Sequence, residues 1–196
     1  MAAGGGTRNG AATAVERLLA DGARALLSFG LAGGLDPALR PGALVVPRAV
    51  LANGERLAVD ADMLAALGGA TVDCIAGGIG VVDDRAAKRR FWEQTGASAI
   101  DLESGAVAAA ARRHGLPFAV LRAICDPAER TVPPAALAAL DRNGAISLLQ
   151  VLAAVAASPT QIPALLALAR DAATARRALA ARVAELARRP EWHPPA

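Results

Sequence analysis

The chain has 196 residues, of which 54% are apolar and 3% aromatic, and its formal net charge is +3 at pH 7. This small charge, without basic clusters interleaved with aromatic residues, argues against a nucleic-acid-binding protein. The length suits one domain with a sizeable core, and no apolar segment is long enough to span a bilayer. No signal peptide is recognisable, and Cys74 and Cys125 are expected to be buried, reduced thiols. We therefore expect a cytoplasmic protein.

The first half of the chain alternates short apolar segments with helices and turns, which is typical of α/β proteins. Thr7 or Asn9 is expected to cap the first helix, and Asp60 the second. The dipeptide Asn53-Gly54 predicts a tight hairpin. The expected strands cover residues 25–29, 43–46, 48–52, 55–59 and 71–76, and the expected helices cover residues 7–20, 60–67 and 84–95.

Two stretches in this half have alternative interpretations. Gly30, Gly33 and Gly34 follow an apolar strand, and we expect a turn there in which the backbone can approach a ligand. An ordinary tight turn is the alternative. The sequence RAAKRR, residues 85–90, lies in a charged helix and is interpreted as a solvated face rather than an anion site.

The segment from residue 99 to residue 126 carries two acids at the ends of apolar runs. The first run ends next to Glu103, a small-residue helix is expected over residues 104–114, and a second run over residues 118–124 leads to Asp126. Open parallel sheets gather their ligands at the carboxyl ends of the strands. The two acids are therefore expected to meet in one pocket, although acids also suit helix starts and turns.

Beyond Asp126 the chain is expected to be helical, with helices over residues 141–157 and 161–189. In the last helix apolar residues recur every three or four positions and form one stripe. The stripe is expected to pack on the domain or on a second subunit. A membrane-surface helix that meets a lipid substrate, with the protein peripheral to the inner face of the membrane, is the alternative. We assign residues 1–158 to an α/β domain and residues 159–196 to a helical extension packed on it.

Two blocks of sequence resemble the nucleoside phosphorylase and nucleosidase superfamily: DLES followed by PFAVLRAICD, and SFGLAGGLDPALRPGALVVP. Within this superfamily the chain is most similar to the hopanoid-associated phosphorylase branch, whose members act on adenosylhopane. Three segments carry this similarity: FGLAGGLDPALRPG, ICDPAERTVPPAALAALDRNG and QIPALLALARDA. The resemblance implies a purine nucleoside phosphorylase-like, three-layer αβα sandwich with a mixed, partly barrelled sheet, and a homo-oligomer. From this resemblance we also expect the strand and loop that open the family's fold to be missing.

The resemblance also implies roles for individual residues. Asp126 matches the acid that protonates the purine at N7, Glu103 matches the acid that holds the ribose hydroxyls, and Arg122 matches an arginine that orients the nucleophile or a catalytic carboxylate. These roles suit the chemistry, because a protonated base leaves more easily and a nearby carboxylate favours a cationic sugar. The remaining matches, all expected to bind substrate, are Gly30, Leu31, Ala32, Gly33, Val81, Val82 and Leu102.

Three departures from the family pattern affect the expected pocket. Leu31 stands where the family often has Ser, Ser28 stands where its phosphorylases tend to have Arg, and Val81 stands where Phe is common. These changes weaken the case for direct phosphate binding and make the pocket more apolar. We expect no metal, since only two histidines are present and no metal-ligand spacing is found.

The sequence therefore predicts an enzyme that removes adenine from a 5′-modified adenosine, with adenosylhopane as the substrate and inorganic phosphate as the acceptor. No other cofactor is expected. Hydrolysis of methylthioadenosine or adenosylhomocysteine is the first alternative. A truncated, inactive nucleoside-binding protein is the second.

Overall fold

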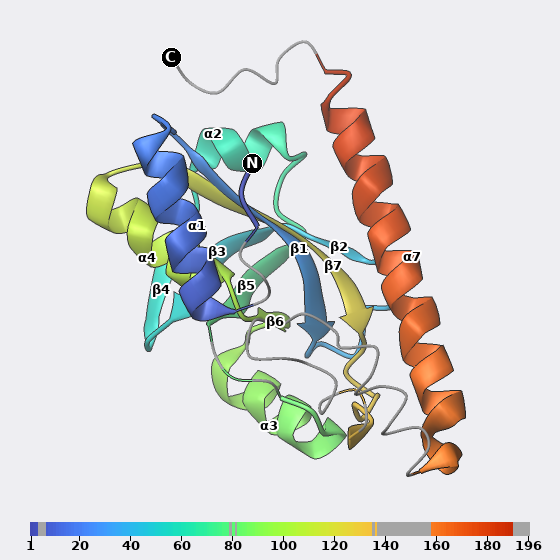
Figure 1. Cartoon of the computed structure of the whole chain (residues 1–196). Coiled ribbons are helices and arrows are strands. Elements are labelled where there is room, and N and C mark those ends of the chain that lie inside the picture. The colour runs from blue at the N-terminus through green and yellow to red at the C-terminus, as the bar shows by residue number, and fades with distance from the viewer. Residues whose placement is uncertain (4–6, 79, 81, 135, 137–157, 190–196) are drawn as a thin grey trace.

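The computed structural model describes residues 1–3, 7–78, 80, 82–134, 136 and 158–189. Within this part, seven strands form one mixed, curled sheet in the order β2-β7-β1-β6-β5-β3-β4 (Figure 1). The strands are β1 (Leu26–Gly34), β2 (Leu44–Val45), β3 (Pro47–Ala52), β4 (Glu55–Ala58), β5 (Val72–Gly77), β6 (Ala99–Asp101) and β7 (Phe118–Asp126). The helices are α1 (Arg8–Ala20), α2 (Ala61–Ala66), α3 (Arg85–Thr95), α4 (Ser104–His114) and α7 (Ile162–Leu186), with a 3-10 turn η1 (Pro159–Gln161). The expected helix over residues 141–157 lies outside the described residues.

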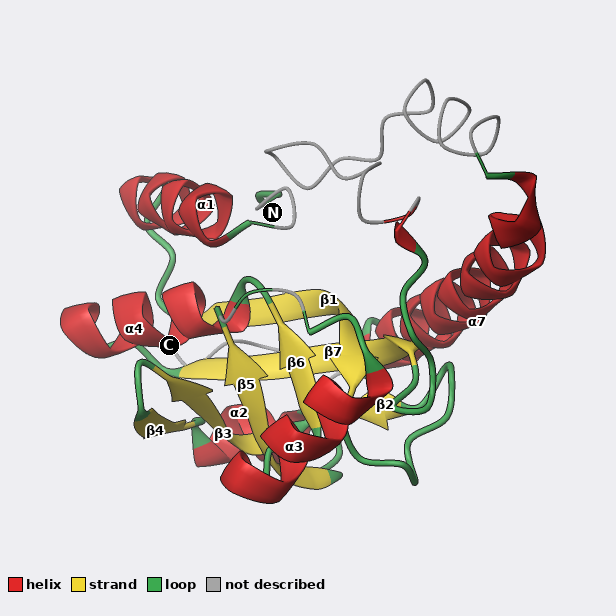
Figure 2. Ribbon diagram, turned by 90° about the horizontal axis from the view of Figure 1, so that it is seen from below, coloured by secondary structure: helices red, strands yellow, loops and turns green. Residues whose placement is uncertain are grey.

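Helices cover the sheet in layers, as Figure 2 shows for α1 and α4. These two helices share an apolar cluster with one face of the sheet, in which Val15, Val107 and Val120 are buried. On the opposite face, α2 and α7 share a second cluster, in which Leu67, Leu121 and Leu179 are buried. The predicted α/β class, with a mixed and partly barrelled sheet between helical layers, is confirmed.

Local sequence signals account for several element boundaries. The Thr7 hydroxyl accepts a hydrogen bond from the Gly10 amide at 3.0 Å, which caps α1. Asn53 and Gly54 both have positive φ, 53° and 79°, as a two-residue turn between β3 and β4 requires. Asp60 caps α2 by accepting from the amides of residues 62 and 63.

Strand β1 is longer than expected. It pairs in parallel with β7 from Leu26 to Gly33, so the glycines predicted to form a turn lie within the strand. The expected turn is wrong, because the ladder with β7 supplies hydrogen-bond partners that a local sequence pattern does not reveal. A shift of register between Ala32 and Gly33 pairs Ala32 with Ile124 and Gly33 with Asp126. This β-bulge leaves Cys125 as the extra residue.

The direction of β6 also differs from the expectation. Strand β6 runs antiparallel to β1, through Gly33 opposite Ile100, whereas β7 runs parallel to β1. The segment 99–126 is therefore not a parallel strand–helix–strand unit. Glu103 nevertheless returns toward the middle of β1, because β6 starts beside the carboxyl end of β1 and runs backward along it.

Helix α7 packs along β7 with the apolar stripe seen in the sequence. Ala175, Leu179 and Leu186 are buried in a cluster with Leu121 and other residues of the sheet. The stripe thus faces the protein, which gives no support to a membrane-surface role for this helix. No helix among the described residues has the length and apolar character needed to cross a membrane.

Candidate active site

Arg122 is the centre of a buried polar network. It lies in the middle of β7 and is 2% exposed. Its Nη2 donates to the hydroxyls of Ser28, at 2.6 Å, and Ser104, at 3.0 Å. Its Nη1 lies 3.4 Å from Glu103 Oε2, and its Nε lies 3.1 Å from Asp101 Oδ2. One buried cation thus joins β1, β6, β7 and the start of α4.

Asp101, which the sequence analysis did not single out, fixes the backbone around Glu103. Its Oδ1 accepts from the amides of Glu103, at 2.7 Å, and Ser104, at 2.6 Å. These amides open α4 and have no partner within the helix. An aspartate whose side chain can accept from backbone amides two and three residues further on is a recognisable sequence pattern. The bonds of Asp101 to the start of α4 could therefore have been predicted from the sequence. Asp101 therefore orients Glu103 through the main chain and Arg122 through its side chain.

Glycines bring the elements of this network close together. A Cβ on Gly30 would lie 2.6 Å from Arg122 Nη1, so a side chain there would displace the guanidinium. Gly77 and Gly105 touch where the carboxyl end of β5 meets the first turn of α4: a Cβ on Gly105 would lie 2.3 Å from the Gly77 carbonyl oxygen. The first turn of α4 sits next to Arg122 because these positions lack side chains.

Asp126 belongs to a different set of contacts. Its Oδ2 lies 2.5 Å from Nζ of Lys88, which is fully buried on α3. Residues 85, 86, 89 and 90 are exposed, as a solvated face predicts, but Lys88 is an exception, because α3 packs on the end of the sheet and buries that side chain. Burial raises the pKa of the Asp126 carboxyl, and the bond with Lys88 opposes that rise. Its other oxygen, Oδ1, is buried and has no hydrogen-bond partner among the described residues.

The predicted site residues fall into two groups. Glu103, Arg122 and Gly30 lie together on the α4 side of the sheet. The bulge in β7 places Asp126 with Gly33, where a Cβ would lie 3.8 Å from Oδ2 of Asp126, on the side that α3 covers. Val82 packs there as well, against the cluster that contains Leu35 and Ile100.

The other predicted substrate contacts are placed less favourably. Leu31 packs toward the α7 cluster, on the face opposite Arg122. Ala32 is buried in the core beneath α4, and Leu102 is half-buried between β6 and α4. Val81 lies outside the described residues. Among the residues that the structure describes, no three His, Cys, Asp or Glu side chains are close enough to hold a metal ion.

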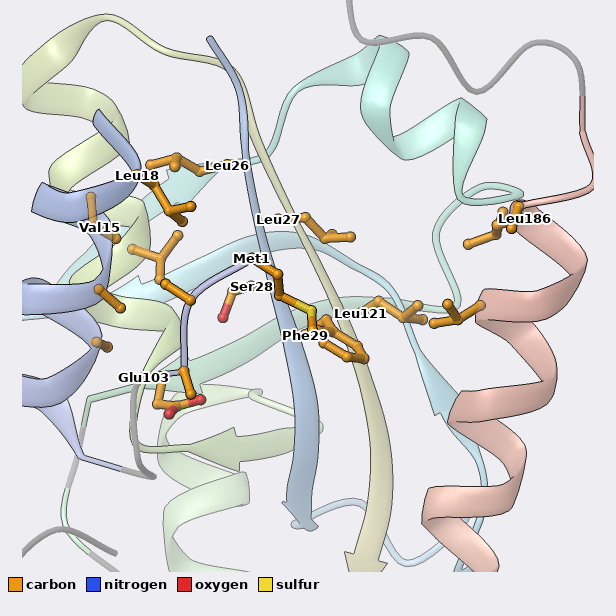
Figure 3. Close-up of a pocket in the computed structure, with 17 residues that line it drawn as sticks. Met1, Val15, Leu18, Leu26, Leu27, Ser28, Phe29, Glu103, Leu121 and Leu186 are labelled. Atoms are coloured by element: carbon orange, nitrogen blue, oxygen red, sulfur yellow. The ribbon is translucent and has the colours of Figure 1, made fainter. Parts of the chain in front are cut away.

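A cavity of about 740 Å³ reaches Glu103 and is otherwise largely apolar (Figure 3). It runs from α1 past the first residues of β1 to α7, with Glu103 near the α1 side and Leu121 and Leu186 near α7. Asp126 is not among its lining residues, so the structure does not bring the two acids into one pocket as the sequence analysis expected. Among the described residues that line it, Glu103 and Ser28 have polar side chains; the rest are Met1, Ala2, Ala3, Ala11, Ala14, Val15, Leu18, Leu26, Leu27, Phe29, Val107, Leu121, Val183, Leu186 and Ala187.

Comparison with known proteins identifies the family. Residues 2–69 and 70–158 match the model of the Phosphorylase superfamily, and the chain belongs to that family. No protein among the curated sequences matches it.

Several solved structures with a similar fold are nucleosidases. One is a 5′-methylthioadenosine/S-adenosylhomocysteine nucleosidase from Neisseria meningitidis in complex with methylthio-immucillin-A, with 20% identity, a TM-score of 0.66, and coverage of 92% of this chain and 77% of that one. A mutant of Helicobacter pylori MTAN with 5′-methylthioadenosine in its active site is 19% identical, with a TM-score of 0.61 and coverage of 91% and 77%. An S-adenosylhomocysteine nucleosidase from Streptococcus pyogenes is 23% identical over 63% of this chain, with a TM-score of 0.58. The chain spans 64% of the Streptococcus pyogenes structure's length. At these identities the likeness shows a shared fold.

Proposed function

We propose that the chain cleaves the N-glycosidic bond of a 5′-modified adenosine, adenosylhopane in particular, and releases adenine with phosphate as the acceptor. The observation that carries this proposal is the apolar cavity that begins at Glu103. Ligand pockets of about 300–1,000 Å³ hold molecules of drug size. A cavity of about 740 Å³ with so few polar side chains suits a large hydrocarbon group better than the methylthio group of a small nucleoside.

The two groups of site residues match the two halves of a nucleoside. Glu103 is the sugar ligand: its carboxylate accepts hydrogen bonds from the ribose hydroxyls, and its charge favours the cationic sugar of the transition state. Asp126 is the purine ligand: it gives a proton to N7 and makes adenine a better leaving group. Burial raises the pKa of Asp126, in the direction that an acid working near neutral pH needs.

Glycines of β1 bring both groups of site residues against one strand. A Cβ on Gly30 would meet Arg122, and a Cβ on Gly33 would meet Ile100 and Asp126. In the proposed complex the nucleoside lies along this strand, with the sugar at Glu103 and the base at Asp126. The apolar group on the 5′ carbon then extends along β1 toward α7.

Hydrolysis of methylthioadenosine or adenosylhomocysteine is the second candidate, and the charge around Arg122 favours water over phosphate. Arg122 is flanked by two carboxylates, Asp101 and Glu103, so the network has a formal charge of −1. The guanidinium bonds are directed to these groups and to two serines. No unpaired cation within this network attracts a phosphate dianion.

Adenine release distinguishes these candidates. Purified protein is incubated with adenosylhopane in detergent micelles, methylthioadenosine or adenosylhomocysteine, each with and without phosphate. The proposal predicts adenine from adenosylhopane and a phosphorylated sugar product when phosphate is present. Adenine formed equally without phosphate identifies a hydrolase, and turnover of the two small nucleosides alone supports the second candidate.

Two variants control for contaminating activity. Glu103→Gln removes the sugar ligand's charge and Asp126→Asn removes the acid, and each is expected to lower adenine release by about 100-fold or more. No release in any arm, while the protein still binds adenosine by calorimetry, would instead indicate an inactive nucleoside-binding protein. Release that neither variant affects would refute the assigned site.

A further inference from the structure

Lys88 is the only lysine of a chain with twenty arginines, and it is fully buried. The residues around it on α3, Arg85, Arg89 and Arg90, are exposed. An uncompensated buried ammonium is costly, so a single buried lysine in a helix of exposed arginines requires a specific partner. Lysine and arginine also differ in geometry: the ammonium is a compact charge with three rotatable donors, whereas the guanidinium is a planar fork.

The contacts of Lys88 use its full bonding capacity. Nζ donates to Asp126 Oδ2 at 2.5 Å, to the Pro127 carbonyl at 3.2 Å and to the Arg130 carbonyl at 3.0 Å. An ammonium has three protons, so none is left for a substrate. Lys88 therefore acts on Asp126 and on the chain that follows it, and does not contact a ligand itself.

The two oxygens of Asp126 are not equivalent. Oδ2 is held by Lys88, whereas Oδ1 is buried and lacks a hydrogen-bond partner among the described residues. Leaving a buried acceptor unpaired costs about 1–3 kcal/mol, and such an atom in a native structure calls for an explanation, of which a catalytic role is one. Oδ1 therefore keeps its bonding capacity for a donor that the described residues do not supply.

We propose that Lys88 is a positioning residue for Asp126: it holds Oδ2 so that Oδ1 is presented to the purine, and its charge sets the proton affinity of the carboxyl group. This inference rests on the proposed function, because it assigns Asp126 to the purine. Lys88 is not a catalytic residue, since it touches neither the substrate nor the reacting atoms.

Lys88 is the closest of the charged groups that face Asp126. From the loop after β7 comes Arg130, and from α7 comes Asp171, which lies 2.5 Å from Arg130 and largely offsets its charge. The thiol of Cys125 adjoins Asp126 from β7. Removing the ammonium leaves the buried carboxyl with little compensation, so the pKa of Asp126 rises further.

Kinetics of Lys88→Met test the positioning role, with Arg89→Met as the matched control one residue further along α3. A general acid contributes about 100- to 10,000-fold to rate, so misplacing it should lower kcat at the pH optimum by at least about tenfold while KM changes by less than about twofold. The activity that is lost when Asp126 deprotonates should persist to higher pH in K88M, because the carboxyl then holds its proton more tightly. R89M should behave as the wild type. Wild-type kcat and an unmoved pH profile in K88M would overturn the proposal.

The pH profile distinguishes the positioning role from a purely structural role of Lys88. If the substitution only loosened the loop after β7, kcat would fall but the pH at which Asp126 titrates would not change. Thermal unfolding of K88M is measured first. If K88M does not fold, Lys88→Gln, which keeps a neutral donor of similar length, takes its place and is expected to give the same direction of shift.

A substrate-free measurement separates this inference from the proposed function. In protein labelled with [13C]aspartate, the side-chain carboxyl signal missing from D126N is that of Asp126, and its titration midpoint should move to higher pH when Lys88 is replaced. [15N]Lysine labelling gives one side-chain signal, which reports the same pair from the other partner. If the midpoint stays in place, the Lys88 inference fails even when the enzyme is active. If it moves but no nucleoside is cleaved, only the proposed function fails.

Discussion

The contact between Gly105 and Gly77 gives a sharp test of how the site is assembled. Replacing Gly105 by alanine places a Cβ 2.3 Å from the carbonyl oxygen and 2.7 Å from the carbonyl carbon of Gly77. Non-bonded atoms normally lie about 3.5 Å or more apart, so relief requires a separation of about 1 Å. Both obstacles are backbone atoms at the end of β5, and no side-chain rotation can relieve them. The first turn of α4 must therefore move away from the sheet.

The expected loss of stability follows from two opposing effects. Overpacking costs about 1–3 kcal/mol, and the upper value applies because backbone meets backbone. Alanine in place of glycine in a helix returns at most about 1 kcal/mol. The net loss is about 2 kcal/mol, and for a chain of this length the Tm should fall by about 4–8 °C.

Thermal unfolding followed by circular dichroism measures this effect, and Gly80→Ala is the matched control. A Cβ on Gly80 meets nothing within 4 Å, and its backbone φ does not require glycine. The control should therefore unfold within about 1 °C of the wild type, since surface substitutions usually change stability by less than about 0.5 kcal/mol. A G105A protein whose Tm equals or exceeds that of the wild type would refute the close packing of α4 on β5.

Three further predictions concern the cavity, the acid and the thiols. Ala14→Phe, which fills the cavity from α1, should lower kcat/KM for adenosylhopane but not for methylthioadenosine, whereas Ala12→Phe on the exposed side of α1 should change neither. Because the pKa of Asp126 is raised in the folded protein, the free energy of unfolding should fall as the pH rises from about 4 through the raised value, and D126N should flatten that slope in urea titrations. Burial raises the pKa of the Cys125 thiol to about 11, so iodoacetamide at pH 8 should label native protein far more slowly than unfolded protein.

Local features of the structure were predictable because their causes are local in the sequence. The caps at Thr7 and Asp60 and the turn at Asn53-Gly54 each depend on residues within a few positions. The helix over residues 104–114 was bounded correctly, because Gly115 adopts the left-handed conformation that ends it. The structure places Arg122 and Glu103, two residues named from the sequence resemblance, 3.4 Å apart; their roles stay a prediction.

Features that depend on distant pairing were not predictable. The three residues of β6 do not predict that the strand runs antiparallel to β1. That direction depends on pairing with a strand about 65 residues away in the sequence. The bulge at Cys125, which turns Asp126 toward α3, is likewise a property of the ladder between β1 and β7. Lys88 looked like one charge in a basic run, because only the tertiary packing of α3 shows that it is buried.

The two acids of the site differ in how their charge is balanced, and this difference fits the separate tasks proposed for them. Glu103 shares one cation, Arg122, with Asp101, so the side of the site assigned to the sugar has an excess of one negative charge. That excess suits a sugar that becomes positively charged. Asp126 has a buried cation of its own, Lys88, and the side assigned to the purine is formally neutral. An acid that must both hold and release a proton benefits from this balance, because desolvation alone would keep it protonated and the ammonium alone would keep it ionised. Since the two cations contact different acids, replacing Lys88 should leave the Arg122 network intact, and the effects of K88M and E103Q on cleavage should combine additively in free energy.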